Sequence, residues 1–282
     1  MYLHHKTIRQ LALIIFTGLA LGACQKLTHP ELGANYPKDS NPPGGPLKFF
    51  AAMDSLNVDS IRANFGVNTN ASIVAGGVSG KALQFDGSQN GYTYYQAPND
   101  FGSSSSFTVS FWINITGAQK DNSHAVGVFT LANANGFWSD IVFYADNNTK
   151  GTTDSMDLKV HFTKADGTDN WDFANYTGKL QWPKMYDGNW HQVGFTYDAS
   201  ARVGTVYRDG AVFDTKTNED IAFFAPSQLI LGGFEQANGI QGKYSDAGNS
   251  WMAGFAGKMD NVRLYGSILS DADMAALYTN KQ

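Results

Sequence analysis

Residues 187–198, DGNWHQVGFTYD, together with residues 205–212, TVYRDGAV, decide the fold class of this chain. In the first stretch the odd-numbered residues from 191 to 197 point one way and the even-numbered residues from 190 to 196 point the other. The second stretch alternates likewise and reaches Asp209-Gly210, a dipeptide that tolerates positive φ at both central positions of a two-residue turn. The two stretches therefore predict an antiparallel β-hairpin, and we expect the indole of Trp190 to fill a space between two sheets.

Composition and patterning extend this interpretation to the rest of the chain. The sequence has 30 glycines, 13 tyrosines and 19 phenylalanines but only three glutamates, so turn formers are abundant and helix formers scarce. Ser270 to Asp273 resembles a capping box and predicts one short C-terminal helix. Further strands are expected at 47–54, 73–86, 92–97, 107–115, 124–132, 137–145, 156–164, 221–223, 228–233 and 255–265. Such a series of short strands predicts an all-β fold of two packed antiparallel sheets.

Four pieces of sequence carry a resemblance to a known family. They are GKALQFDG at 80–87, FTVSFWI at 107–113, the hairpin at 187–212, and FAGKMDNVRLY at 255–265, which Leu269-Ser270-Asp271 closes. In this order they resemble the laminin-G-like branch of the concanavalin A-like lectin/glucanase domains. The resemblance implies a two-sheet antiparallel jelly-roll sandwich over 47–282. It also implies that Trp112 and Trp190 are packing residues.

The N-terminal residues resemble those of a bacterial lipoprotein. Residues 1–23 have a basic start and a short apolar run, and they end in Leu-Gly-Ala before Cys24, the only cysteine. We interpret 1–23 as a signal peptide, Cys24 as the lipidated residue, and 24–46 as a Pro/Gly-rich tether. The alternative is a plain secretory signal with an incidental cysteine. The expected location is the outer membrane, on its periplasmic or its cell-surface face.

Charge and motif content bear on the class of function. The net charge is −5 and no run of Lys or Arg occurs, so a nucleic-acid partner is not expected. Related glucanases carry paired acids in a pattern close to E-x-D-x-x-E, which this sequence lacks, since Glu31, Glu219 and Glu235 are isolated. His161 and nearby Tyr144 are the only residues suggestive of a lyase, and we interpret His161 as a hydrogen-bonded strand histidine. We therefore predict no enzymatic activity.

The resemblance also implies a structural calcium site. Domains of this kind often hold calcium between their first and last strands, and the matching positions are Asp260 and, less directly, Asp54. Carboxylate and carbonyl oxygens are the ligands that calcium prefers. The alternative is that Asp260 only accepts backbone hydrogen bonds or pairs with Arg263.

Loop tryptophans are the candidate ligand-binding residues, because indole rings stack on the apolar faces of sugars while neighbouring amides and carboxylates bind the hydroxyls. The segment 166–176 supplies Trp171 with Asn170 and Asp172, and the turn at 136–140 supplies Trp138. Two further candidates are Trp182 and Trp251. The alternative for each ring is that it folds back to cover a sheet edge.

The sequence thus predicts a lipid-anchored, non-catalytic binding protein whose ligand is a carbohydrate. An adhesion or protein-interaction module is the alternative, and a glycoside hydrolase or polysaccharide lyase with an atypical site is a third. An aromatic cluster in a groove would favour sugar, and a broad flat apolar patch would favour protein. Ionisable groups converging in a groove would favour an enzyme.

Overall fold

The computed structural model describes residues 45–87, 91–115, 124–135, 137–146, 155–171, 173, 181–235 and 251–282. The chain divides into two units, 1–40 and 41–282, and everything described here belongs to the second. The predicted signal peptide and Cys24 lie outside the described residues. Among the described residues, no helix combines the length and the apolar character needed to cross a bilayer.

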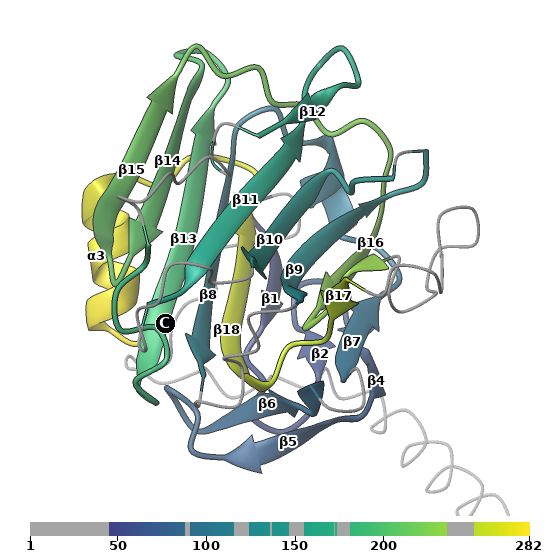
Figure 1. Cartoon of the computed structure of the whole chain (residues 1–282), viewed down its shortest axis with the longest axis vertical. Coiled ribbons are helices and arrows are strands. Elements are labelled where there is room, and N and C mark those ends of the chain that lie inside the picture. The colour runs from purple at the N-terminus through teal and green to yellow at the C-terminus, as the bar shows by residue number, and fades with distance from the viewer. Residues whose placement is uncertain are drawn as a thin grey trace, which may run out of the picture. The chain divides into compact units, whose positions relative to one another are not determined.

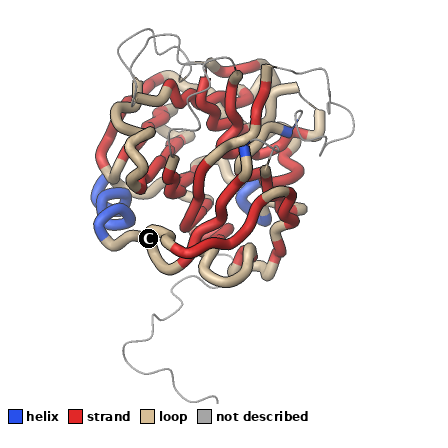
Figure 2. Tube along the Cα trace, turned by 60° about the horizontal axis from the view of Figure 1, so that its bottom comes forward, coloured by secondary structure: helices blue, strands red, loops and turns tan. Residues whose placement is uncertain are grey.

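Strands make up most of the described chain and form two sheets (Figures 1 and 2). Sheet A contains, in spatial order, β15 (Ala211–Thr217), β14 (Val203–Arg208), β13 (Trp190–Asp198), β8 (Phe107–Asn114), β18 (Gly257–Tyr265), β1 (Leu47–Ala51), β2 (Val58–Asp59) and β3 (Asn64–Phe65), with β6 (Lys81–Phe85) on β18 and β5 (Ala71–Ala75) on β6. Sheet B contains β12 (Asp169–Asn170), β11 (Asp157–Thr163), β10 (Ile141–Asp146), β9 (Ala125–Asn133), β16 (Pro226–Leu231), β7 (Tyr92–Tyr95) and β4 (Val67–Thr69), with β17 (Met252–Ala253) on β9. Neighbours are antiparallel except β17 and β9, which are parallel. The predicted two-sheet antiparallel sandwich is confirmed.

The core lies between the two sheets and is rich in phenylalanine. Phe111 of β8 stacks on Phe129 of β9 with ring centroids 5.6 Å apart and planes 3° from parallel. Phe143 of β10 meets both rings edge-on, at 5.4 and 5.5 Å. Such pairs add about 0.5–1.5 kcal/mol each beyond the burial of apolar area. Sheet A and sheet B are therefore held together by rings contributed from both.

The hairpin predicted over residues 187–212 is present as β13, β14 and β15. Asp209 and Gly210 join β14 to β15 with φ of +52° and +75°, which confirms the predicted two-residue turn. His191 contacts an aspartate in each of two turns. Its Nδ1 lies 3.0 Å from an oxygen of Asp209, and its Nε2 lies 3.2 Å from an oxygen of Asp187. This histidine thus ties the start of β13 to the β14–β15 turn.

Trp190 does not lie between the sheets, so that prediction is wrong. Val193 and Phe195 belong to the core, and Trp190 has the opposite phase along β13. Its Nε1 donates to the carbonyl oxygen of Gly76, in the β5–β6 connection, at 3.3 Å. Trp112 of β8 is fully buried as expected, but on the outer face of sheet A, where its ring stacks on Tyr278 at 5.4 Å.

The predicted C-terminal helix is α3 (Asp271–Thr279), which lies beside β13, β14 and β15 near the C-terminus (Figures 1 and 2). Ser270 and Asp273 form the expected capping box. Met274 packs where Gly194 has no side chain, since a Cβ there would lie 2.2 Å from the Met274 methyl group. The helix therefore closes the outer face of sheet A.

Three segments differ from the expected strands. The stretch 73–86 is a hairpin, β5 and β6, because Gly76 and Gly80 adopt positive φ between them. The stretch 137–145 becomes a strand only from residue 141. At 221–223 there is no strand, only an isolated bridge between Ile221 and Lys164. The structure also has a short 3₁₀ helix, η2 (Asn99–Ser103), and the short strands β2, β3, β4, β12 and β17.

Candidate functional site

The outer face of sheet B, turned away from the core, carries the candidate site. On β10, Phe143 faces the core, so its neighbours Val142 and Tyr144 face outward. His161 of β11 pairs with Val142 and also faces outward. Sheet alternation therefore sets one aromatic and one imidazole ring on this face as the base of the site.

Three of the predicted tryptophans come together over this base. Trp138 precedes β10, Trp171 follows β12 and Trp251 precedes β17; the ring of Trp138 lies 4.8 Å from that of Trp171 and 5.8 Å from that of Trp251. Tyr144 lies 6.3 Å from Trp138, and Phe234 lies 6.0 Å from Tyr144 and 6.1 Å from Trp251. We call these five rings the aromatic cluster. Trp138 and Trp171 are half-buried, and Trp251 is 39% exposed.

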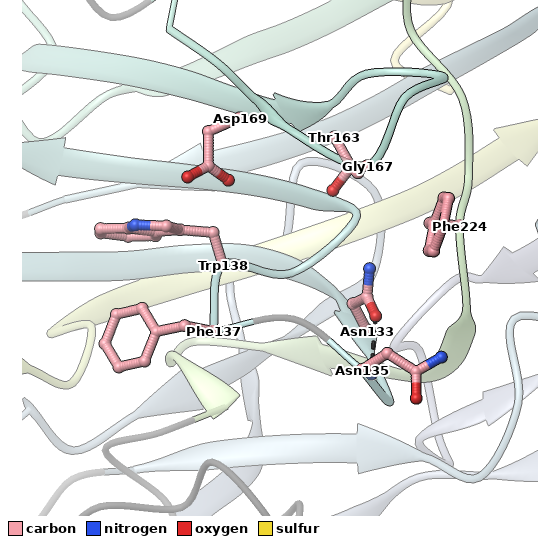
Figure 3. Close-up of a pocket in the computed structure, with 8 residues that line it drawn as sticks. All are labelled: Asn133, Asn135, Phe137, Trp138, Thr163, Gly167, Asp169 and Phe224. Carbon is pink, nitrogen blue, oxygen red and sulfur yellow. Dashed lines mark hydrogen bonds between the residues drawn. The ribbon is translucent and has the colours of Figure 1, made fainter.

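A pocket of about 230 Å³ adjoins the aromatic cluster. Figure 3 shows Phe137 and Trp138 on one side of it, Phe224 on the opposite side, and two asparagines between them. Phe137 and Phe224 are 37% and 55% exposed. The pocket is lined by Asn133, Asn135, Phe137, Trp138, Thr163, Gly167, Asp169 and Phe224. Aromatic walls around a few polar groups are typical of small-ligand sites.

One charged side chain, Asp169 of β12, lines the pocket. Its Oδ1 is 2.9 Å from Nε2 of His161, and 44% of its side chain is exposed. Burial lowers the pKa of His161, although the neighbouring Asp169 carboxylate acts in the opposite direction. The rings of Trp171 and Trp138 lie 4.4 and 5.5 Å from the imidazole. His161 is thus the hydrogen-bonded strand histidine that we expected.

Two of the remaining predicted ligand residues point away from this site, and a third is outside the described residues. Asn170 is buried, and its Nδ2 donates to Oε2 of Glu219 at 2.6 Å. Trp182 is fully buried and its Nε1 donates to the Leu158 carbonyl at 3.1 Å, so its assignment to a ligand site is wrong. Asp172 lies outside the described residues.

Two buried carboxylates lie behind the pocket. Asp140 accepts hydrogen bonds from the amide of Asn133 and from the backbone N–H groups of Phe224 and Ala225, so it holds the Phe224 loop against the end of β9. Burial raises the pKa of Asp140 to about 6 and that of Glu235 to about 7. One Glu235 oxygen accepts from Ser139 Oγ at 3.1 Å, and the other has no hydrogen-bond partner among the described residues.

The two predicted calcium ligands converge on the β5–β6 connection, on the opposite sheet. Asp260 accepts from the backbone N–H groups of Val78 and Ser79 at 2.8 and 3.3 Å, and Asp54 accepts from that of Lys81 at 3.0 Å. Burial raises the pKa of Asp260 to about 7, and the charge of Asp54 adds to this effect. Arg263 lies over the ring of Phe50, with its guanidinium carbon 4.1 Å from the centroid. Among the described residues no group of three or more His, Cys, Asp or Glu is placed to hold a metal ion.

Several pocket residues were not found by sequence reasoning. Asp169 directly precedes Asn170, which is the predicted ligand residue. The register of β12 on β11 decides which of these two side chains faces outward. Phe224 lies between the strands expected at 221–223 and 228–233, in a stretch without a recognisable motif. Asn133, Asn135 and Thr163 are common polar residues at strand ends, and nothing in their local sequence marks them as part of a site.

Comparisons with known proteins identify the fold. A family model described as the concanavalin A-like lectin/glucanases superfamily, of laminin G type, matches residues 86–275. No curated protein sequence matches the chain.

Three solved structures illustrate the likeness. The binding domain of Paraclostridial Mosquitocidal Protein 1 has a TM-score of 0.58 and 16% identity, over 84% of this chain and 52% of that one. The botulinum neurotoxin serotype D binding domain has a TM-score of 0.57 and 12% identity, over 84% of this chain and 52% of that one. Domain 4 of an extracellular arabinanase from Geobacillus stearothermophilus, in complex with arabinotriose, has a TM-score of 0.54 and 18% identity, over 82% and 98%.

The match spans about half of each toxin binding domain and nearly all of the arabinanase domain. At these identities the likeness shows the fold. The family model covers well over half of the sequence, and the two sheets and the closing helix agree with it. The chain belongs to the concanavalin A-like lectin/glucanase superfamily, in its laminin G-type branch.

Proposed function

We propose that this chain is a non-catalytic binding protein that takes a carbohydrate on the outer face of sheet B. The observation that carries the proposal is the convergence of Trp138, Trp171 and Trp251 beside a pocket with asparagine, threonine and aspartate side chains. The rings offer flat apolar surfaces to sugar C–H groups, and the polar side chains offer hydrogen bonds to hydroxyls. Trp138 belongs to both the aromatic cluster and the pocket, so one ligand can contact both.

The similar structures support a binding role of this kind. Two of them are binding domains of toxins, and the third is a domain of an arabinanase in complex with arabinotriose. The fold therefore serves recognition in proteins of different overall function. Fold likeness alone does not transfer a ligand, so the proposal rests on the aromatic cluster and the pocket.

A glycan array followed by isothermal titration on residues 25–282 tests the proposal. We expect saturable binding, and we expect Trp138→Ala to weaken it by about tenfold or more, as for a central aromatic anchor. Trp190→Ala is the matched control, since Trp190 is half-buried on the outer face of the other sheet. Circular dichroism verifies that both variants fold. Binding that is unchanged in Trp138→Ala would remove the aromatic cluster from the proposal.

A protein partner is the second candidate. Phe137, Phe224 and Trp251 are substantially exposed, and exposed aromatic side chains are enriched at protein interfaces. This function would be favoured by two results together. The protein would bind no glycan on the array, and it would capture a defined envelope protein that the variant Phe224→Ala no longer captures. Loss of capture in Phe224→Ala distinguishes binding at the pocket from nonspecific adsorption elsewhere on the molecule.

A hydrolase is the third candidate, and Glu235 is the observation that favours it. A buried carboxyl with a pKa raised to about 7 can donate a proton near neutral pH. We expect no turnover of any glycan that binds, measured as release of reducing ends. Turnover that Glu235→Gln abolishes, with binding retained, would replace the non-catalytic proposal.

Lipid anchoring through Cys24 is a separate part of the proposal and rests on the sequence. We expect the full chain expressed in a Gram-negative host to fractionate with the outer membrane and to carry acyl chains on Cys24. Cys24→Ser is expected to release it into the soluble fraction. Protease shaving of whole cells then distinguishes the periplasmic from the cell-surface face.

Calcium binding at Asp260 and Asp54 also remains a proposal. The two carboxylates are close enough for the charge of one to raise the pKa of the other, which a divalent cation would relieve. Among the described residues no third His, Cys, Asp or Glu accompanies the pair, so further ligands would have to be backbone carbonyls, uncharged side-chain oxygens or water. We expect calcium to raise the Tm of the wild type and not that of Asp54→Asn. If the Tm is the same with calcium and with chelator, the calcium proposal fails. Asp260 and Asp54 then serve only to hold the β5–β6 connection by hydrogen bonds.

A further inference from the structure

The pocket beside Trp138 is lined by residues of only one charge sign. Among the residues that the structure describes, its lining includes one carboxylate, Asp169, and no lysine, arginine or histidine. Figure 3 shows the Asp169 carboxylate on the same side of the pocket as the ring of Trp138. A ligand in this pocket would therefore meet a negative charge and aromatic faces, without a cation.

The one imidazole in contact with Asp169 does not cancel this charge. Nε2 of His161 is 2.9 Å from Asp169, but burial lowers the pKa of His161, so the ring is neutral near pH 7. A neutral imidazole donates its N–H to the carboxylate and leaves the full negative charge in place. Since 44% of the Asp169 side chain is exposed, the carboxylate can contact a ligand.

The charged groups behind the pocket and beside it do not reverse its sign. Asp140 is hydrogen-bonded to Asn133 and is an acid, not a base. Asp166, on the turn between β11 and β12, is a second acid near the pocket. Lys164 is the cation of that turn, and its charge acts on Asp166. The pocket therefore keeps a net negative character at neutral pH.

We propose that this pocket takes a sugar that carries a cationic amino group, with Asp169 as its counter-ion, and rejects uronates and other anionic sugars. This inference rests on the carbohydrate-binding role proposed above and specifies its ligand class. An ammonium group gains a charge-assisted hydrogen bond to Asp169. It also gains attraction to the faces of Trp138, Phe137 and Phe224, which a carboxylate lacks. An anionic sugar would meet Asp169 without a compensating cation.

The test compares three oligosaccharides of equal length, made of glucosamine, N-acetylglucosamine or galacturonate, by isothermal titration at pH 7 in low salt and in high salt. We expect the glucosamine oligomer to bind about three- to tenfold more tightly than the N-acetylated one, as for a partly exposed ion pair. High salt is expected to reduce this preference. The galacturonate oligomer is expected not to bind.

The variant Asp169→Asn keeps a hydrogen-bond acceptor for His161 and removes the charge, so it is expected to abolish the preference while retaining the fold. Asp198→Asn is the charge-matched control, because Asp198 is an exposed carboxylate at the turn after β13, in the other sheet. This control is expected to keep the wild-type preference.

Equal binding of the amino and N-acetylated oligomers, or binding of the galacturonate oligomer, would overturn the amino-sugar inference while leaving a carbohydrate-binding role. A preference that persists in Asp169→Asn would overturn it as well. If none of the three oligomers binds, the amino-sugar inference fails, and the glycan array then decides separately whether the carbohydrate-binding role fails with it.

Discussion

Trp182 and Trp251 come from similar polar, aromatic-rich sequence, yet the structure places them in opposite environments. Trp182 is fully buried and packs on Phe213 with ring centroids 4.6 Å apart, while Trp251 is partly exposed on the aromatic cluster. We expect Trp182→Ala to lower the free energy of unfolding by about 3–5 kcal/mol, because it leaves a cavity in the core. Trp251→Ala is expected to cost about 1 kcal/mol or less. Urea denaturation followed by circular dichroism measures both, and equal losses in the two variants would contradict this assignment.

Asp169 and Asn170 show how far local sequence predicts a binding site. Trp171 and Asp169, both from the segment 166–176, lie beside the candidate pocket, whereas the predicted Asn170 is buried and faces away from it. The wrong polar residue was chosen, because adjacent residues of a strand face opposite sides. Which side is outward depends on the pairing of Phe162 with Asn170, a contact between strands that the local sequence does not specify.

At the scale of elements, the turn between β14 and β15 was fully predictable, because a dipeptide with two positive φ angles has a strong local signal. The start of β10 at residue 141 could not be predicted from the local sequence. Asp140, directly before it, is held by N–H groups of Phe224 and Ala225, which come from a distant segment. Local patterning therefore predicts most of the longer strands, whereas long-range hydrogen bonds set the loop that carries Phe137 and Trp138.

Gly210 allows a prediction that separates backbone strain from packing. A Cβ at Gly210 would lie 2.7 Å from Tyr278 Cβ and 3.0 Å from Ala275 Cα in α3, whereas a Cβ at Gly188, also at positive φ, meets nothing within 4 Å. Gly188→Ala is expected to cost about 1–2 kcal/mol from the left-handed backbone alone. Gly210→Ala is expected to cost clearly more, because α3 must also move. The free energy of unfolding of both variants tests this difference, and equal costs would mean that α3 adapts freely.

At the scale of the whole molecule, the two sheets have different outer faces. On sheet A the outer face is closed by α3, where Met274 and Leu277 pack with Tyr207. On sheet B the outer face carries the aromatic cluster, and the acids behind its pocket are buried. The sandwich thus has one outer face partly covered by its own helix and one outer face that carries exposed rings beside a pocket.

The buried acids make the stability of the whole molecule depend on pH in a defined direction. Burial raises the folded pKa of Asp140 to about 6 and that of Glu235 to about 7, while unfolded carboxyls titrate near pH 4. Between these values the folded chain binds more protons than the unfolded chain, so the free energy of unfolding falls as pH rises from about 4 to 7. The lowered pKa of His161 acts in the opposite direction, since the unfolded histidine takes up a proton more readily below about pH 6.5.

Because three buried acids with raised pKa values, Asp140, Glu235 and Asp260, outweigh one histidine, we expect the Tm to be highest at about pH 4–5 and to fall toward pH 7, in buffers that contain a chelator. Glu235→Gln removes one of the three carboxyl groups with a raised pKa, so its Tm should fall less steeply than that of the wild type between pH 5 and pH 8. Asp198→Asn is the control: hydrogen bonds from Ser200 and Ala201 lower the pKa of Asp198, so its contribution to stability changes with pH only below about pH 4 and is constant between pH 5 and pH 8. Thermal unfolding across this pH range measures all three proteins. A wild-type Tm that rises steadily to pH 8, or an unchanged slope in Glu235→Gln, would mean that water or a cation stabilises the ionised carboxylates behind the pocket.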